Sequence, residues 1–249
     1  MMGMNFFKTS TLWYVLALPA LAQLFVACLF HGADQIPPAA LALGTAAITI
    51  VIACMLWPML FSDTLVQPRD LGLWTLLTSA VALLLMMANT PVTSWPSLAL
   101  PLAAGVLAIS FLLGTLTLFL NRLVKLDAPI AHRVVLTTFI VAATTPLWLG
   151  PVAGMLASQG FTDLIIAVSP VGYLISLIDY DALRSAWFYT HTPLGGLRYD
   201  YPNPVIFTMI YCSWAALMLG ISCVRWHRFA GKDDTNFTSF HFIHKEPTI

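Results

Sequence analysis

The chain has 249 residues, of which 59% are hydrophobic and 9% are charged, and its formal net charge at pH 7 is zero. A soluble domain carries about a quarter charged residues, so this composition excludes a soluble protein and predicts an integral membrane protein. The charged residues form no basic run, which argues against a nucleic-acid partner.

Six apolar stretches are long enough to cross a bilayer, where a helix needs roughly 20 residues to span about 30 Å of hydrocarbon. They use up most of the chain, so we expect a single transmembrane domain over residues 1–249. The sequence thus predicts an all-α polytopic membrane protein with the lipid bilayer as its surroundings. The predicted spans are residues 11–31, 38–61, 71–89, 97–120, 133–156 and 204–224.

The Lys and Arg residues sort by connection. Nine of the eleven lie at the N-terminus, in every second loop or in the C-terminal tail. Only Arg184 and Arg198 lie in the remaining loops, which are predicted to be on the other side of the membrane. Membrane proteins keep Lys and Arg on the cytoplasmic side, so both termini are predicted to be cytoplasmic, in a bacterial inner membrane. The nine are Lys8, Arg69, Arg122, Lys125, Arg133, Arg225, Arg228, Lys232 and Lys245.

The last connection, residues 157–203, contains a further apolar segment from Leu164 to Ile178. It is too short to cross comfortably, and Pro170 and Gly172 interrupt it. We therefore predict a re-entrant helical hairpin between helices five and six, entering and leaving on the outer side. Irregular backbone at membrane depth is tolerated only where it packs on protein or lines a wet cavity.

Aromatic and charged residues follow this hairpin, as is typical of a segment at the membrane interface. The group of Asp179, Asp181, Arg184, Arg198 and Asp200 either binds a polar head group or a metal, or forms local ion pairs, and we favour ion pairs. The candidate gate and platform residues are Pro170, Gly172, Tyr173, Asp179, Asp181, Arg184, Trp187 and Arg198.

The six spans contain essentially no ionisable side chains, which argues against ion-coupled transport and proton relays. The histidines form no pair at matching depth in two spans, as a haem would need, and the four cysteines resemble small buried hydrophobes. No nucleophile–base pair is visible. We therefore expect no catalytic residue, cofactor or metal site, and no enzyme activity.

The run Ser169-Pro170-Val171-Gly172-Tyr173-Leu174 and a last span ending in Arg225-Trp226-His227-Arg228 carry a family resemblance. Over residues 133–228 the layout resembles the permease subunits of ABC-2 type exporters. That resemblance implies six helices with both ends inside and a re-entrant hairpin between the last two. It also implies a partner membrane subunit and an amphiphilic or polymeric substrate.

The phosphate-binding pattern GxxxxGK[ST] is absent, so under this resemblance ATP hydrolysis belongs to a separate nucleotide-binding ATPase. The first internal loop, Phe61 to Leu71, is shorter than the family's coupling helix. The alternative is a non-catalytic accessory subunit of a respiratory, photosynthetic or oxidase complex. The candidate contacts to a cytoplasmic partner are Asp63, Arg69, Asp70, Arg122 and Lys125.

Overall fold

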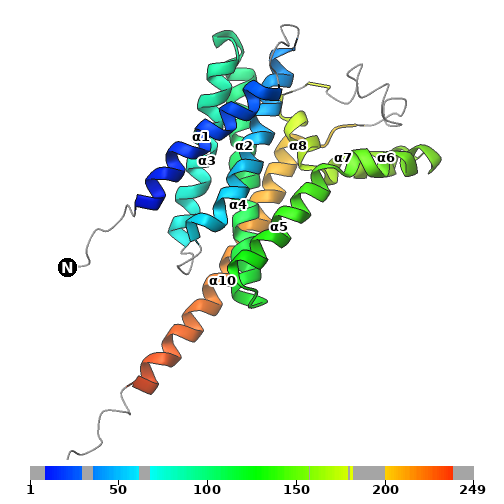
Figure 1. The fold of residues 1–249 in the computed structure, drawn as a ribbon. Coiled ribbons are helices and arrows are strands. Elements are labelled where there is room, and N and C mark those ends of the chain that lie inside the picture. Colours follow the sequence, from blue (N-terminus) through cyan, green and yellow to red (C-terminus); the bar gives the residue numbers. More distant parts are fainter. Residues whose placement is uncertain are drawn as a thin grey trace, which may run out of the picture.

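The computed structural model describes the backbone of residues 9–29, 36–61, 68–156, 158–178, 180–181 and 200–237. Side chains are described for residues 17–28, 36–57, 70–156, 158–178, 180–181 and 200–224. This part of the chain is all-helical, as predicted (Figure 1). Its helices are α1 (Thr9–Leu29), α2 (Pro38–Phe61), α3 (Pro68–Asn89), η1 (Val92–Ser94), η2 (Trp95–Ala99), α4 (Leu100–Leu123), α5 (Ala128–Ala143), α6 (Thr145–Leu156), α7 (Gln159–Val168), α8 (Pro170–Ser176) and α10 (Pro204–Phe237).

Four helical segments are long and apolar enough to cross a membrane: Pro38–Trp57, Asp70–Asn89, Val92–Leu123 and Pro204–Val224. A fifth crossing exists if α5 and α6 are taken together as one span. These segments agree with the predicted second, third, fourth and sixth spans, and they are compatible with an integral membrane protein. Helix α1 covers most of the predicted first span, but its described apolar part, Ala17–Cys28, is shorter than these candidates. The six-crossing arrangement therefore stays a prediction.

The predicted fifth span is not one straight helix. It bends by 44° between α5 and α6, at Thr144. Pro146 has no N–H to donate to the Ala142 carbonyl, and a missing bond of this kind is a usual cause of a kink. The Thr145 hydroxyl donates to the Val141 carbonyl at 3.1 Å, so side chains take over part of the interrupted hydrogen bonding.

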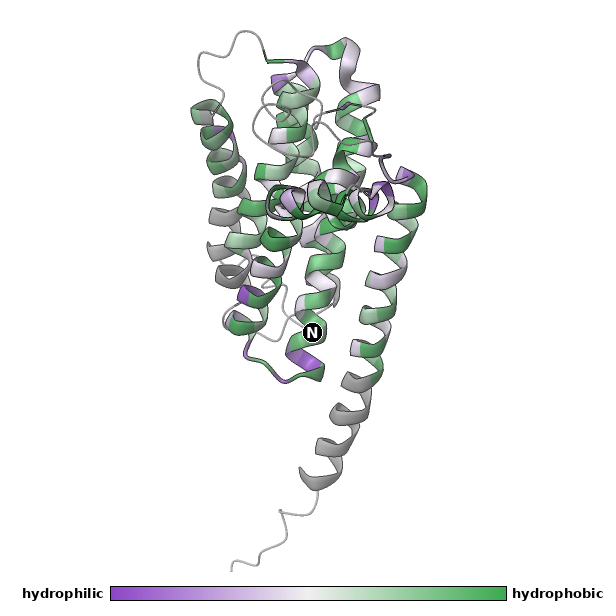
Figure 2. Ribbon diagram, turned by 90° about the vertical axis from the view of Figure 1, so that its right-hand side faces the viewer, coloured by the Kyte–Doolittle hydropathy of each residue, from purple (hydrophilic) through white to green (hydrophobic). Residues whose placement is uncertain are grey.

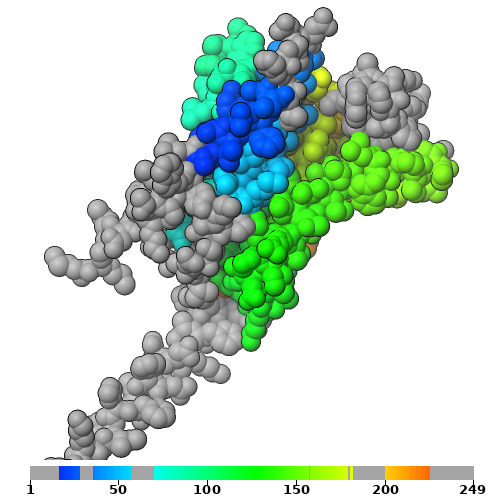
Figure 3. Space-filling model, in the orientation of Figure 1, coloured from blue at the N-terminus to red at the C-terminus, as the bar shows by residue number. Residues whose placement is uncertain are grey.

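Beyond the bend, α6 and α7 lie side by side and extend away from the bundle as an arm (Figures 1 and 3). Ala153 on α6 and Ile165 on α7 are buried between the two helices, with Leu149 and Phe161 packed against them. Apolar side chains also cover the outside of the arm, and Met155 is 86% exposed. Such a surface suits the interior or the interface of a bilayer.

Helix α4 is the centre of the bundle and packs against α2, α3, α5 and α10. Small residues allow the close approach: a Cβ added at Gly114 would overlap the Leu71 side chain of α3. Interfaces between membrane helices are enriched in small residues for this reason. By contrast, only 11% of Pro204–Val224 in α10 is buried, and Figure 2 shows hydrophobic colouring on its outward faces.

Most buried polar side chains in the bundle are hydroxyls that bond within their own helix. The Thr49 hydroxyl donates to the Thr45 carbonyl at 2.7 Å, and the Thr78 hydroxyl donates to the Trp74 carbonyl at 2.9 Å. The Ser79 hydroxyl on α3 bonds to another helix instead, donating to the Ala103 carbonyl on α4 at 2.8 Å. Bonds of this kind let a hydroxyl sit in an apolar interior without an unsatisfied donor.

Among the described residues, His132 on α5 is the exception to this satisfaction of buried polar side chains. Its side chain is 4% exposed, and neither ring nitrogen has a hydrogen-bond partner there. The Cys54 backbone lies beside the ring, but the approach does not have the geometry of a hydrogen bond. A buried polar group without a partner lowers stability by about 1–3 kcal/mol.

We expect His132→Leu to raise the free energy of unfolding by about 1 kcal/mol or more, because it removes unsatisfied polar atoms at similar volume. Reversible unfolding of the purified protein in detergent measures this change. The matched control is Thr138→Ala, at an exposed position on the same helix. A lower stability for His132→Leu than for the control would show that the ring has a stabilising partner.

Candidate functional site

The predicted break in the re-entrant segment is confirmed and lies at Ser169, one residue before Pro170. Ser169 has an extended backbone with φ −77° and ψ 122°, so α7 ends before it and α8 begins at Pro170. A residue that precedes proline is pushed towards this conformation, and proline is favoured at the first position of a helix. Residues 164–178 therefore do not form one straight helix.

The Ser169 side chain connects this break to the bend in the preceding span. Ser169 is fully buried, and its hydroxyl donates to the carbonyl of Ala143, the last residue of α5, at 3.2 Å. The Leu147 amide bonds to the Thr144 carbonyl instead of to Ala143, which leaves the Ala143 carbonyl for the serine. One hydrogen bond, between residues that are 26 positions apart, thus joins the two interruptions.

Gly172 allows α8 to fold back against α7. A Cβ at this position would overlap the carbonyl oxygen of Ile166, which is backbone and cannot swing aside. The absence of a side chain is therefore required by close approach rather than by an unusual backbone angle.

Tyr173 fixes α8 against α10. It is fully buried, its hydroxyl lies 2.7 Å from the Thr208 hydroxyl, and its ring meets Tyr211 edge-on at 4.8 Å between centroids. Gly105 of α4 leaves room for α8, since a Cβ there would lie 2.9 Å from the Leu174 side chain. The short helix is therefore packed among the longer helices of the bundle, α2, α4, α5 and α10.

A cavity of about 420 Å³ lies beside the end of α8 and the start of α10. Across its rim the Tyr201 hydroxyl donates to a carboxylate oxygen of Asp181 at 2.6 Å. The neighbouring Asp200 amide donates to Asp163 of α7 at 2.8 Å, which ties this connection to the arm. The lining residues are Ile175, Ser176, Tyr180, Asp181, Tyr201, Pro202, Asn203 and Pro204.

The structure brings four of the predicted gate and platform residues to this region. Pro170, Gly172 and Tyr173 lie on α8, and Asp181 lines the cavity. Sequence reasoning missed Ser169, Thr208 and Tyr211, which carry no distinguishing pattern in an apolar sequence. The other predicted positions, Asp179, Arg184, Trp187 and Arg198, lie outside the described residues.

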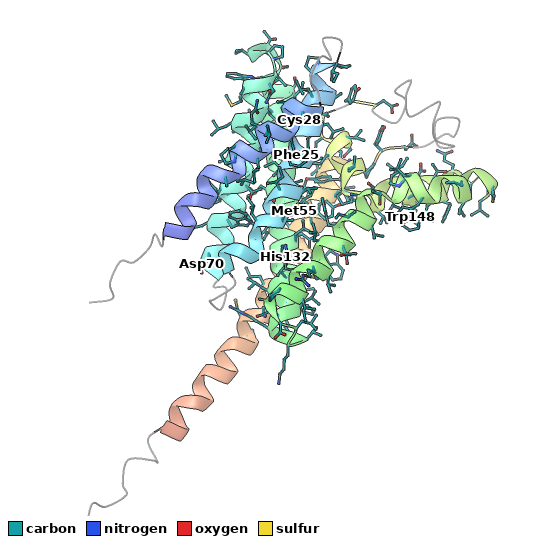
Figure 4. All side chains as sticks on the ribbon, viewed as in Figure 1. Phe25, Cys28, Met55, Asp70, His132 and Trp148 are labelled. Carbon is teal, nitrogen blue, oxygen red and sulfur yellow. The ribbon has the colours of Figure 1, made fainter. Side chains whose placement is uncertain are left out.

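The predicted partner contacts lie at the opposite end of the bundle. Asp70 is in the first turn of α3 and Arg122 in the last turn of α4, and these helices pack against each other in opposite directions. Lys125 is exposed in the following turn, with a left-handed φ of 58°. Asp63 and the Arg69 side chain lie outside the described residues. Figure 4 shows Asp70 and His132 towards one end and Cys28 towards the other.

No group of three or more His, Cys, Asp or Glu side chains is placed to hold a metal ion within the part of the chain that the structure describes. Comparison with known proteins finds no protein-family model, no curated protein and no solved structure that matches this chain. The candidate site therefore has to be interpreted from its own geometry.

We expect Gly172→Ala to lower the free energy of unfolding by about 1–3 kcal/mol, because the added methyl group meets the Ile166 backbone and separates α7 from α8. Gly160→Ala on α7 is the matched control, since nothing lies within 4 Å of its added Cβ. Unfolding in detergent measures both variants. If the two behave alike, α7 and α8 do not approach as closely as the structure indicates.

Proposed function

We propose that this chain is the membrane-spanning permease subunit of an ATP-driven exporter of an amphiphilic or polymeric substrate. In this proposal six helices cross a bacterial inner membrane, both termini are cytoplasmic, and a separate subunit hydrolyses ATP. The proposal rests mainly on one observation, the break between α7 in the arm and α8, which packs into the bundle against α4, α5 and the last span α10.

Such a broken segment is costly to build, because every interrupted backbone group needs a partner. Here the Ser169 bond links α8 to α5, and the Tyr173–Thr208 bond links it to α10. A displacement of α5 relative to α10 would therefore act directly on α8. These contacts support a role for α8 as the outer gate of a passage, which opens when the spans move.

The opposite end of the bundle supplies the surface on which an ATPase would act. Asp70, Arg122 and Lys125 lie near the ends of α3 and α4, and the candidate contacts Asp63 and Arg69 precede Asp70 in the sequence. Force applied there reaches α8 through α4, whose Gly105 contacts α8. The passage would form between two subunits, and its apolar walls would suit an amphiphile better than a small ion.

The high exposure of α10 favours a second candidate function, an accessory subunit of a larger membrane complex. Trp214 is 54% exposed and Met209 is 64% exposed on a helix that packs mainly on α4. Another membrane chain could cover this face as readily as lipid does. In that case α8 and the cavity beside it would form part of a docking surface.

We expect the chain to co-purify with a P-loop ATPase subunit, and the isolated chain to hydrolyse no ATP, because it lacks a phosphate-binding loop. Pro170→Leu should reduce transport several-fold in reconstituted vesicles while the complex still assembles. Pro91→Leu, at an exposed position in the turn before α4, is the control.

Co-purification with cofactor-bearing chains, and loss of those chains in Pro170→Leu, would support the accessory subunit instead. ATP hydrolysis by the pure isolated chain would contradict both candidates.

Topology has its own test. In a variant without the four native cysteines, we expect Lys125→Cys to be protected from an impermeant thiol reagent in intact cells and Asp200→Cys to react. Both positions are exposed in the structure, so burial does not explain a difference. Labelling of both positions from the same side would contradict the six-crossing arrangement.

A further inference from the structure

The arm formed by α6 and α7 leaves the bundle at a depth that the length of α5 sets (Figure 3). Helix α5 has 16 residues, so it is about 24 Å long, and it begins just after the exposed charged residues Lys125 and Asp127. Charged side chains stay at the polar edge of a bilayer whose hydrocarbon is about 30 Å thick. The bend at Thr144 therefore lies in the leaflet on the side opposite Lys125, which we call the distal leaflet.

Helix α6 exposes an apolar surface at this depth. It has no charged residue, and its one hydroxyl residue, Thr145, is buried. Trp148 is 51% exposed, and its indole N–H donates to the Val141 carbonyl at 3.3 Å. The polar atom of this exposed ring thus has a partner within the protein and does not require water or a head group. Such a surface suits contact with acyl chains.

Helix α7 has a polar edge as well as an apolar one. Gln159 and Asp163 are four residues apart and share one edge, whereas the exposed residues Leu164 and Val168 share another. The Asp163 carboxylate accepts from the Asp200 amide at 2.8 Å, so the polar edge lies against the connection that leads to α10. A carboxylate is costly in hydrocarbon, so this edge marks the side of the arm that faces the head groups.

The extent of the apolar surface favours lipid over a second copy of the chain as its cover. Leu147 and Leu156 are two and a half turns apart, at about 3.6 residues per turn, so they point to opposite sides of α6. Both are exposed, and the exposed residues Val152 and Met155 lie between them. One packed helix would cover a single stripe of this surface, whereas acyl chains would cover all of it.

From these features we infer that the arm inserts sideways into the distal leaflet and that its apolar surface is covered by phospholipid acyl chains. Helix α6 and the apolar edge of α7 would contact the acyl chains, and the edge of Gln159 and Asp163 would lie just below the head groups. The arm would thus anchor the chain in one leaflet. Only the identity of the distal leaflet as the outer one rests on the proposed function, because insertion does not require transport.

Spin labels on single cysteines test this inference in the purified full chain, in vesicles of phosphatidylglycerol where copies are free to associate. The background lacks the four native cysteines. Power saturation measures collisions of each label with oxygen, which concentrates in hydrocarbon, and with a nickel chelate present on both sides of the vesicles, which stays in water. The labelled variants are Met155→Cys and Gln159→Cys on the arm, with two references at exposed positions, Leu217→Cys in the apolar segment of α10 and Lys125→Cys.

We expect the ratio of oxygen to nickel collisions at Met155→Cys to resemble that at Leu217→Cys and to exceed that at Lys125→Cys severalfold. Gln159→Cys should give a ratio between the two references, because its edge faces the head groups. The unfolding midpoint shows whether each labelled chain is folded.

Two results in folded chains would overturn the inference. An immobilised label at Met155→Cys with few collisions of either kind would show that protein covers the arm, as at an interface between copies. A ratio like that at Lys125→Cys would place the arm in water. Neither result depends on an ATPase or on the orientation of the chain, so this test and the tests of the proposed function fail separately.

Discussion

A helix that is interrupted inside a bilayer leaves backbone groups that water cannot reach, so the protein itself must satisfy them. In the described part of this chain the helices are interrupted at Thr144 and at Ser169, and the bond from the Ser169 hydroxyl to the Ala143 carbonyl brings these breaks together. The path of the chain from α5 to α8 depends on that meeting point. Helix α6 leaves the bundle there, α7 returns to it, and α8 re-enters among the longer helices.

The packing around α8 follows from the same constraint. A helix of only seven residues cannot satisfy its ends or bury its sides alone, so neighbouring elements must approach closely. Gly105 on α4 and Gly172 on α8 provide the space, and Tyr173 contributes both a buried ring and a hydrogen bond to α10. The cavity lies where this insertion ends, since α8 is too short to fill the space beside the first turn of α10.

Hydropathy alone locates α2, α3, α4 and most of α10, because each contains an apolar run of about 20 residues or more. Pro170 locates the second break to within one residue, because proline constrains the residue before it. The break at Thr144 has no marker at its own position, since Pro146 disturbs the helical turn that precedes it. The pairing of α6 with α7 and the cavity depend on contacts between distant segments, which no local pattern records.

Residue type alone identifies only some of the residues of the candidate site. Asp181 stands out as a charge beside an apolar segment, whereas Ser169 and Thr208 are common residues whose importance comes from where the fold puts them. His132 is the opposite case, a residue conspicuous in the sequence whose ring nitrogens find no partner in the described bundle. Polar residues in an apolar chain therefore mark candidate positions, and the tertiary contacts decide which of them matter.

Helix α10 continues without interruption for 34 residues, well past the 21 residues of its apolar segment. At 1.5 Å per residue it is about 50 Å long, of which about 30 Å lies in the apolar part. Its other end therefore projects beyond the bundle (Figure 1). Thr208, which contacts Tyr173, lies near the start of this helix, so most of the length of α10 lies beyond that contact. Tilting the helix about its first turn by about 5° would move its far end by about 4 Å, so a small rearrangement around Tyr173 would become a larger displacement at the far end of α10.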